Sequence, residues 1–272
     1  MNPLLFFYLA ILAYGLATVG FLVHLVKPGA GAARFAFRAT GGGFGLQTLA
    51  ILGRLWERGS LPMGSFFDAL LLLSWCILLV FLLLHVRYRL PVLGSFLVPL
   101  SLVLMISASH LSKETDALSA SLQNTWVVVH TAFLFLGDAA FAVACVLSVL
   151  YLVQEHAIKT KRLGLLVRRL PALEVLDDMN AKVILMGFPL LTLGILTGVV
   201  LAKQLWGSVW SWDPKQVLSL ATWLTYAVLL NGRLTLGWRG RRASVLAIVG
   251  FVLVTFTFLG VNLLMKGRHI FS

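Results

Sequence analysis

Residues 187–202 read GFPLLTLGILTGVVLA, a run without a charged side chain. Its apolar residues are continuous and do not alternate with polar ones, which favours a membrane-spanning helix of about 20 residues over a barrel strand. The same character extends over the chain, because 60% of its 272 residues are hydrophobic and only 12% are charged. A soluble domain of this length cannot bury so much apolar surface. The sequence therefore predicts an all-α, polytopic transmembrane helical bundle.

Outward from this run, apolar segments recur along the whole chain and predict about eight spans in a single membrane domain, residues 1–272. The spans are expected at residues 4–26, 35–53, 66–85, 90–108, 126–153, 182–203, 217–232 and 244–264. The second span holds GGGFG at 41–45, which indicates either close helix packing or a local break. The first span lacks a basic leading segment and a small-residue cleavage site, so we expect it to be retained and not removed as a signal peptide.

The net charge of +12 is interpreted as a topology signal and not as a nucleic-acid-binding surface. One set of alternate loops carries fifteen of the 22 Lys and Arg residues and is expected to face the cytoplasm. Both termini and the loop at about 203–217 then lie on the outer, periplasmic side of a bacterial inner membrane. The longest inner loop, 154–181, contains LGLLVRRL, which is either a plain connector, the favoured reading, or a short amphipathic helix on membrane lipid.

The loop that follows the opening run reads WGSVWSWDPKQ at 206–216. Its second half is typical of a helix start, because Asp213 is a favoured N-cap and Pro214 suits the first helical position. Gln216, three residues after the cap, is able to close a capping box. The charged part of this loop therefore has a structural explanation, whatever else it does.

The three tryptophans of this loop have two readings of equal weight. Tryptophan is enriched in the aromatic belts at membrane surfaces. Belts, however, spread their rings around a bundle, whereas three rings in one loop make a local surface suited to a large, flat, apolar ligand. If the segment is helical, Trp206 and Trp210 share a face.

Three histidines are expected at the same outer side as the tryptophans: His110, His130 and His269. Two of them lie at the membrane-surface ends of different spans. His130 opens the fifth span and His269 follows the eighth, so they are candidates to converge on one metal. A haem would use imidazoles as axial ligands, apolar surfaces for its faces and cations for its propionates. Outer cations that suit this role are Lys203, Lys215, Lys266 and Arg268. The sequence has no P-loop, HExxH, GxSxG or Cys/His metal cluster that indicates another chemistry.

Three further residues lie inside expected spans. Asp138 is a carboxylate within the fifth span, where charged groups usually have a function. It pairs with a neighbouring helix or belongs to a proton path, and the sequence does not choose between these. Cys76 and Cys145 form no CxxC motif and are interpreted as packing residues.

Several segments together resemble the tryptophan-rich WWD family of haem-handling membrane proteins, in the branch that contains CcsA and HemX. The similar segments are WGSVWSWDPKQ, PMGSFFDALLLLSW at 62–75, LSASLQNTWVVVHTAF at 118–133, GFPLLTLGILTGVVLA, TWLTYAVLL at 222–230, GWRGRR at 237–242 and GFVLVTFTFLGVNLLMKGRHIF at 250–271. They cover about two thirds of the chain in the same order as in the family.

The resemblance implies a site for haem b on the outer side, with His130 and His269 as axial ligands of the iron. It implies that the rings of the loop, with Asp213, pack and orient the porphyrin, while Lys215 and Arg268 are candidates for its propionates. The matching positions of the loop are Trp206, Trp210, Trp212 and Asp213. It further implies a CcsB-type membrane partner and a secreted apocytochrome c whose CxxCH cysteines receive the haem through thioether bonds.

Two positions depart from the family pattern. Gln216 stands where family members have Glu, a mild change because both close a capping box. Asn231 stands where the synthetase branch has a membrane histidine, and Asn does not replace imidazole as an axial ligand. Either His24 or His85 takes the place of that histidine, or the protein has a HemX-like role, in which haem is bound for regulation of haem biosynthesis without attachment. The HemX-like role is the main alternative function. A small-molecule transporter is a minor alternative from outside the family.

Overall fold

The computed structural model describes residues 2–27, 29–58, 65–111, 125–161 and 164–260. It contains eight α-helices: α1 (Pro3–Val26), α2 (Ala30–Arg58), α3 (Phe66–Tyr88), α4 (Pro91–Ser109), α5 (Thr125–Lys159), α6 (Leu173–Trp206), α7 (Pro214–Thr235) and α8 (Arg241–Thr255). A short 3-10 helix, η2 (Val167–Arg169), precedes α6, and a π-helical turn, η3 (Phe256–Gly260), follows α8. The eight predicted helices are confirmed, and the described part of the chain contains no strand.

Seven of these helices are long and apolar enough to cross a membrane. The chain is therefore a multi-pass membrane protein, as its composition predicts. The remaining helix, α2, has 29 residues but is less apolar than the others, because glycines and charged residues interrupt its apolar positions. The sides on which the two termini lie stay a prediction.

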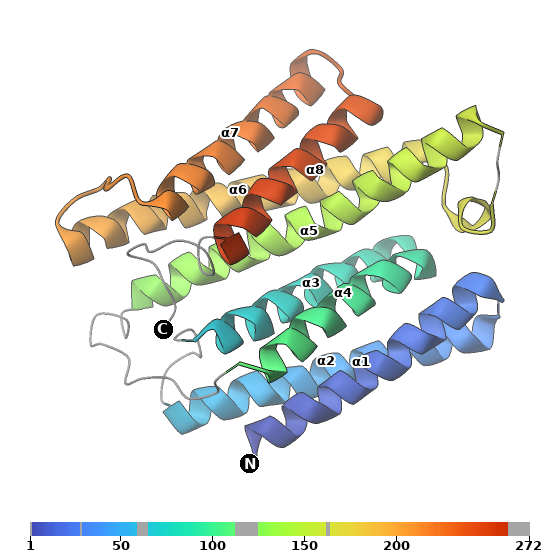
Figure 1. The fold of residues 1–272 in the computed structure, drawn as a ribbon, viewed down its shortest axis with the longest axis horizontal. Coiled ribbons are helices and arrows are strands. Elements are labelled where there is room, and N and C mark those ends of the chain that lie inside the picture. The colour runs from blue at the N-terminus through green and yellow to red at the C-terminus, as the bar shows by residue number, and fades with distance from the viewer. Residues whose placement is uncertain (1, 28, 59–64, 112–124, 162–163, 261–272) are drawn as a thin grey trace. The chain divides into compact units, whose positions relative to one another are not determined.

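The described helices form two compact units, one of α1 to α4 and one of α5 to α8 (Figure 1). In each unit every helix contacts the next along the chain, and the fourth contacts the first. Each unit is thus a closed ring of four helices. The functional prediction of a single domain over residues 1–272 stays a prediction.

The GGGFG segment does not break its helix, since α2 runs without interruption through residues 41–45. Close packing explains Gly43, where a methyl group would lie 2.6 Å from Cε1 of Tyr14. The hydroxyl of Tyr14 in turn donates to Oε1 of Gln47 over 2.6 Å. Small residues at this point let α1 and α2 approach closely while a buried amide keeps a partner.

The connector between α5 and α6 is shorter than the predicted loop 154–181, because α5 continues to Lys159 and α6 begins at Leu173 instead of near residue 182. Within the described residues 164–170, only the three-residue turn η2 is helical, so the connector reading is the better one. Pro171 follows at once, and so short a segment does not sustain an α-helix of its own.

The second unit is held together by an unusually close contact between α5 and α6. A row of small residues lines this contact, and a methyl group at any of them would clash with the facing helix or press against it: Gly137, Gly187, Gly194 and Gly198. Such residues let the backbones of membrane helices approach. Side chains of α5 consequently lie directly on the backbone of α6, and one of them is His130.

Candidate functional site

The tryptophan loop of the second unit begins where α6 ends. Trp206 is the last helical residue, and Gly207 caps the helix with a left-handed backbone at a φ of 72° and an N–H that donates to Lys203 O over 3.0 Å. Residues 207–213 are not helical, so Trp206 and Trp210 do not share a helical face. The condition on which that expectation depended is not met, because α6 ends at Trp206, four residues before Trp210, at a left-handed glycine.

The two later tryptophans of the loop contact each other instead. Trp210 and Trp212 meet edge to face, with ring centroids 5.5 Å apart and an interplanar angle of 84°. Trp212 has a φ of 55°, a conformation that is strained for a bulky side chain, yet 77% of it is exposed. Strain at an exposed aromatic residue is typical of a functional surface.

The polar end of the loop starts α7 as the sequence predicts. The carboxylate of Asp213 accepts a hydrogen bond from the Lys215 N–H over 2.9 Å, and Pro214 is the first helical residue. Asp213 is only 5% exposed, although Trp212 next to it projects from the molecule. Lys215 is half-buried. The cap therefore fixes the exposed ring of Trp212 relative to a buried carboxylate.

Gln216 supports the loop by a different contact from the predicted capping box. Its Oε1 accepts hydrogen bonds from the N–H of Ser211 over 2.9 Å and from the Ser211 hydroxyl over 3.2 Å, and not from the N–H of Asp213. The amide thus reaches two residues further back and holds the turn between Trp210 and Trp212. Gln216 acts only as an acceptor in these two hydrogen bonds, so the carboxylate of a glutamate at this position would make the same two contacts.

His130 lies on α5 and is half-buried against α6. Its Nδ1 is 2.8 Å from the carbonyl oxygen of Gly194 and 3.4 Å from the hydroxyl oxygen of Thr197. Because a carbonyl only accepts, Nδ1 carries the proton, and the lone pair of the neutral ring lies on Nε2. An imidazole with one nitrogen held in this way is the usual form of a histidine that ligates a metal.

The contact of His130 with α6 relates it to the tryptophan loop. Gly198 faces the His130 ring, and eight residues separate Gly198 from Trp206. Along a helix this is about 12 Å, so His130 packs on the last third of α6, towards the end that leads into the tryptophan loop. One predicted ligand and the predicted aromatic surface thus belong to the same unit, and their convergence on one ligand stays a prediction. His269 and Arg268, with Lys266, lie outside the described residues.

Asp138 makes no hydrogen bond or ion pair with any described residue. The side chain of Tyr226 lies within electrostatic range of Asp138, and the role of Asp138 stays a prediction. Cys76 is buried and Cys145 is half-buried, neither forms a disulfide, and their packing role stays a prediction. Within the residues that the structure describes, no group of three or more His, Cys, Asp or Glu side chains gathers into a metal site.

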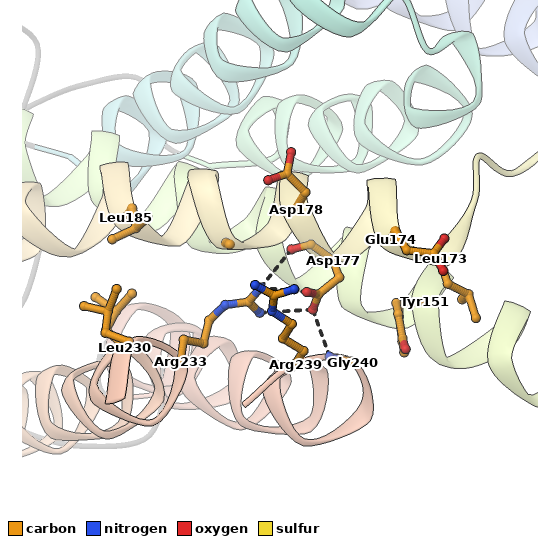
Figure 2. A pocket seen from close by; sticks show the side chains of 12 residues that line it. Tyr151, Leu173, Glu174, Asp177, Asp178, Leu185, Leu230, Arg233, Arg239 and Gly240 are labelled. Carbon is orange, nitrogen blue, oxygen red and sulfur yellow. Dashed lines mark hydrogen bonds and ion pairs between the residues drawn. The ribbon is translucent and has the colours of Figure 1, made fainter. Parts of the chain in front are cut away.

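At the other end of the second unit, an ion pair joins α6 to α7, and the sequence did not identify it. The guanidinium of Arg233 binds the carboxylate of Asp177 at 3.1 and 2.8 Å, with the side chains only 10% and 12% exposed (Figure 2). The Gly240 N–H also donates to this carboxylate, over 2.9 Å. The signal that could have found it is the presence of Asp177 next to a strongly basic segment of the sequence.

This ion pair borders a pocket of about 420 Å³ between α6, α7 and the turn into α8 (Figure 2). Charged and apolar side chains line it together, among them Glu174, Arg239 and Leu230. Asn231 lies instead on an exposed part of α7, where the Thr235 hydroxyl donates to its Oδ1 over 2.9 Å. The pocket is thus distinct from the position at which the synthetase branch carries its histidine.

Comparison with known proteins relates the chain to one family. The family described as "Cytochrome C assembly protein" matches residues 63–269. The chain is 36% identical over 232 residues to the cytochrome c biogenesis protein CcsA of Chlamydomonas reinhardtii, covering 82% of this chain and 64% of that protein. It is 35% identical over 254 residues to CcsA of Guillardia theta, covering 84% of each chain.

A solved structure shares the fold of the chain. The cytochrome c haem lyase CcmF superposes with a TM-score of 0.69 and 18% sequence identity. The match covers 98% of this chain and 47% of the CcmF chain. This likeness extends the relation from sequence to the arrangement of helices, and the chain spans only about half of that larger protein.

Proposed function

Because the chain belongs to the cytochrome c assembly protein family, we propose that it binds haem at the outer membrane face and presents it for attachment to an apocytochrome c. The observation that carries the proposal is the contact of His130 with Gly194. The His130 imidazole of α5 packs against α6, the helix that ends at the tryptophan loop, and this contact supports the proposal. The proposed location is the bacterial inner membrane, with this loop on the periplasmic side.

The haem would be held by one set of residues with three roles. His130 and His269 would supply the axial nitrogens to the iron of haem b. The loop tryptophans Trp206, Trp210 and Trp212 would cover the porphyrin, with Asp213 and Gln216 fixing their position. Lys215 and Arg268 would bind the propionates, whose charge suits cations at the edge of an apolar surface.

The chemistry of attachment would belong to haem and to the substrate protein. Each thioether forms when the S–H of a CxxCH cysteine adds across a vinyl C=C of the haem, so that no group leaves. This chain would contribute by holding the macrocycle still and leaving its vinyl edge open to the incoming thiols. A CcsB-type membrane subunit is the proposed partner that completes the site.

One observation favours a second candidate function. Asn231, in place of the family histidine, is exposed and hydrogen-bonded to Thr235, so it offers no ligand for haem within the membrane. A HemX-like protein, which binds haem without attaching it, would not need such a ligand. The two functions share the outer site and differ in the attachment step.

The shared part is tested by the absorption spectrum of the protein purified from haem-replete cells. We expect a Soret band in the wild-type protein and its loss or shift when His130 and His269 are both changed to Ala. His110→Ala is the matched control, because His110 is an exposed histidine at the C-terminal cap of α4. A wild-type protein without haem, or a double variant with an unchanged band, would refute haem binding at this site.

The attachment step is tested in a strain without its own maturation system. The chain is co-expressed with a CcsB-type subunit and a CxxCH apocytochrome reporter, and covalent haem is detected on the denatured reporter. Covalent haem supports the presenting function. Haem on the membrane protein with none on the reporter supports the HemX-like function.

A further inference from the structure

We propose that Gly194, Thr197 and Gly198 of α6 form a backbone cradle that positions His130, which rests on the proposed function for the identity of the ligand that His130 meets. The cradle would select the Nδ1–H tautomer of the ring and direct Nε2 to the haem iron. None of its three residues needs to touch haem. They act through His130 and are positioning residues.

The first argument for the cradle is steric. A methyl group at Gly198 would lie 2.6 Å from Cε1 and 3.1 Å from Nδ1 of His130. At Gly194 it would lie 2.5 Å from Cδ2 of Leu134, one helical turn along α5 from His130. Real Cβ contacts are not this short, so the imidazole has its present place only because α6 has no side chain there. Any residue other than glycine at 198 would push the ring outward.

The second argument concerns hydrogen bonding. The acceptor for the His130 Nδ1–H is a main-chain carbonyl, Gly194 O, at 2.8 Å. The Thr197 hydroxyl donates to the carbonyls of Leu193 and Gly194, over 2.7 and 2.9 Å, and its oxygen stands 3.4 Å from Nδ1. Thr197 thus binds the same carbonyl as the imidazole. Such an outer partner fixes the tautomer and the ring plane of a metal-binding histidine and raises its basicity.

The two arguments depend on each other. The carbonyl is within reach of Nδ1 only because the glycine one turn later allows the ring to lie against the helix. A side chain at 198 would therefore displace the ring and remove its hydrogen bond in one step. Mutation of outer-shell partners typically lowers metal affinity by about 10- to 100-fold, so we expect a loss of haem affinity of at least about tenfold.

The test compares Gly198→Ala with Gly187→Ala. Both glycines belong to α6 and face α5, and a methyl group at Gly187 would press on Ala140 and Phe141, far along the helix from His130. Both variants are expected to lower thermal stability. Only Gly198→Ala should weaken haem binding and move the absorption spectrum and midpoint potential of the iron. Equal effects of both variants on the spectrum, or none from Gly198→Ala, would overturn the proposal.

A measurement on the haem-free protein separates this proposal from the proposed function. The ¹⁵N chemical shifts of the His130 ring report its tautomer directly, and we expect Nδ1–H in the wild type and in Gly187→Ala. A wild-type ring with its proton on Nε2 would overturn the cradle even if Gly198→Ala does not fold. If the wild type has the Nδ1–H ring but takes up no haem, the proposed function fails and the cradle stands. Thr197→Val, the milder variant, should shift the iron potential while haem stays bound, and an unchanged potential would remove Thr197 from the cradle.

Discussion

At the residue scale, Trp212 has two energetically unfavourable features that packing does not explain. Its backbone is left-handed, which costs a non-glycine residue about 1–2 kcal/mol, and its ring is mostly exposed. The buried cap at Asp213 and the contact of Gln216 with Ser211 hold it in this conformation from both sides. A ring forced outward by its neighbours is what a ligand platform requires.

Because of this strain, we expect glycine to be a more stable replacement for Trp212 than alanine, the reverse of the order found inside helices. Trp212→Ala and Trp212→Gly both remove the ring, but only glycine tolerates the left-handed backbone. We expect the Gly variant to be more stable than the Ala variant by about 1 kcal/mol, measured by thermal unfolding in detergent. Both should bind haem more weakly than the wild type.

Trp56 provides the control for this order. It is 90% exposed but belongs to α2, where glycine is less favourable than alanine by up to about 1 kcal/mol. Trp56→Ala should therefore be the more stable of its pair. The same order at both positions would show that the backbone at Trp212 is not strained.

At the scale of elements, two neighbouring aspartates of α6 have different surroundings. Asp177 binds Arg233 of α7 where both side chains are nearly buried, whereas Asp178 pairs with Lys182 where the side chains are 55% and 53% exposed. A buried charge that loses its partner is costly, while an exposed pair is screened by water. Only the first pair joins two helices.

We therefore expect Asp177→Asn to destabilise the protein by about 3 kcal/mol and Asp178→Asn by less than about 0.5 kcal/mol. The two changes are chemically identical and lie in consecutive positions of one helix. Thermal or denaturant-induced unfolding in detergent would measure the difference. Similar small effects at both positions would mean that the ion pair does not hold α6 and α7 together.

At the scale of the whole molecule, the distribution of basic residues predicts the orientation of every loop. Ser208, in the tryptophan loop, and Thr235, at the other end of α7, are both exposed. In spheroplasts we expect a membrane-impermeant maleimide to label Ser208→Cys and not Thr235→Cys until the membrane is opened. Labelling of the wild type, which contains Cys76 and Cys145, measures the background from these two native cysteines. Labelling of Thr235→Cys alone in intact spheroplasts would invert the topology and place the haem site on the cytoplasmic side.

The sequence alone determined the helices, because the bilayer sets a length and a polarity that each segment satisfies by itself. It also placed the cap at Asp213, since capping depends on residues within one turn. Local composition was less informative about where helices begin and end. At Leu173, for example, an amphipathic segment extends α6 beyond its apolar run.

Only the tertiary structure decided which groups face each other across helices. The contact of His130 with Gly194 spans 64 positions in the chain, and that of Asp177 with Arg233 spans 56. A hydrophobic pattern shows that a helix is buried but not which residue of which neighbour it meets. The loop tryptophans and His130 were therefore found from the sequence, while the cradle that holds His130 and the ion pair that joins α6 to α7 follow from packing alone.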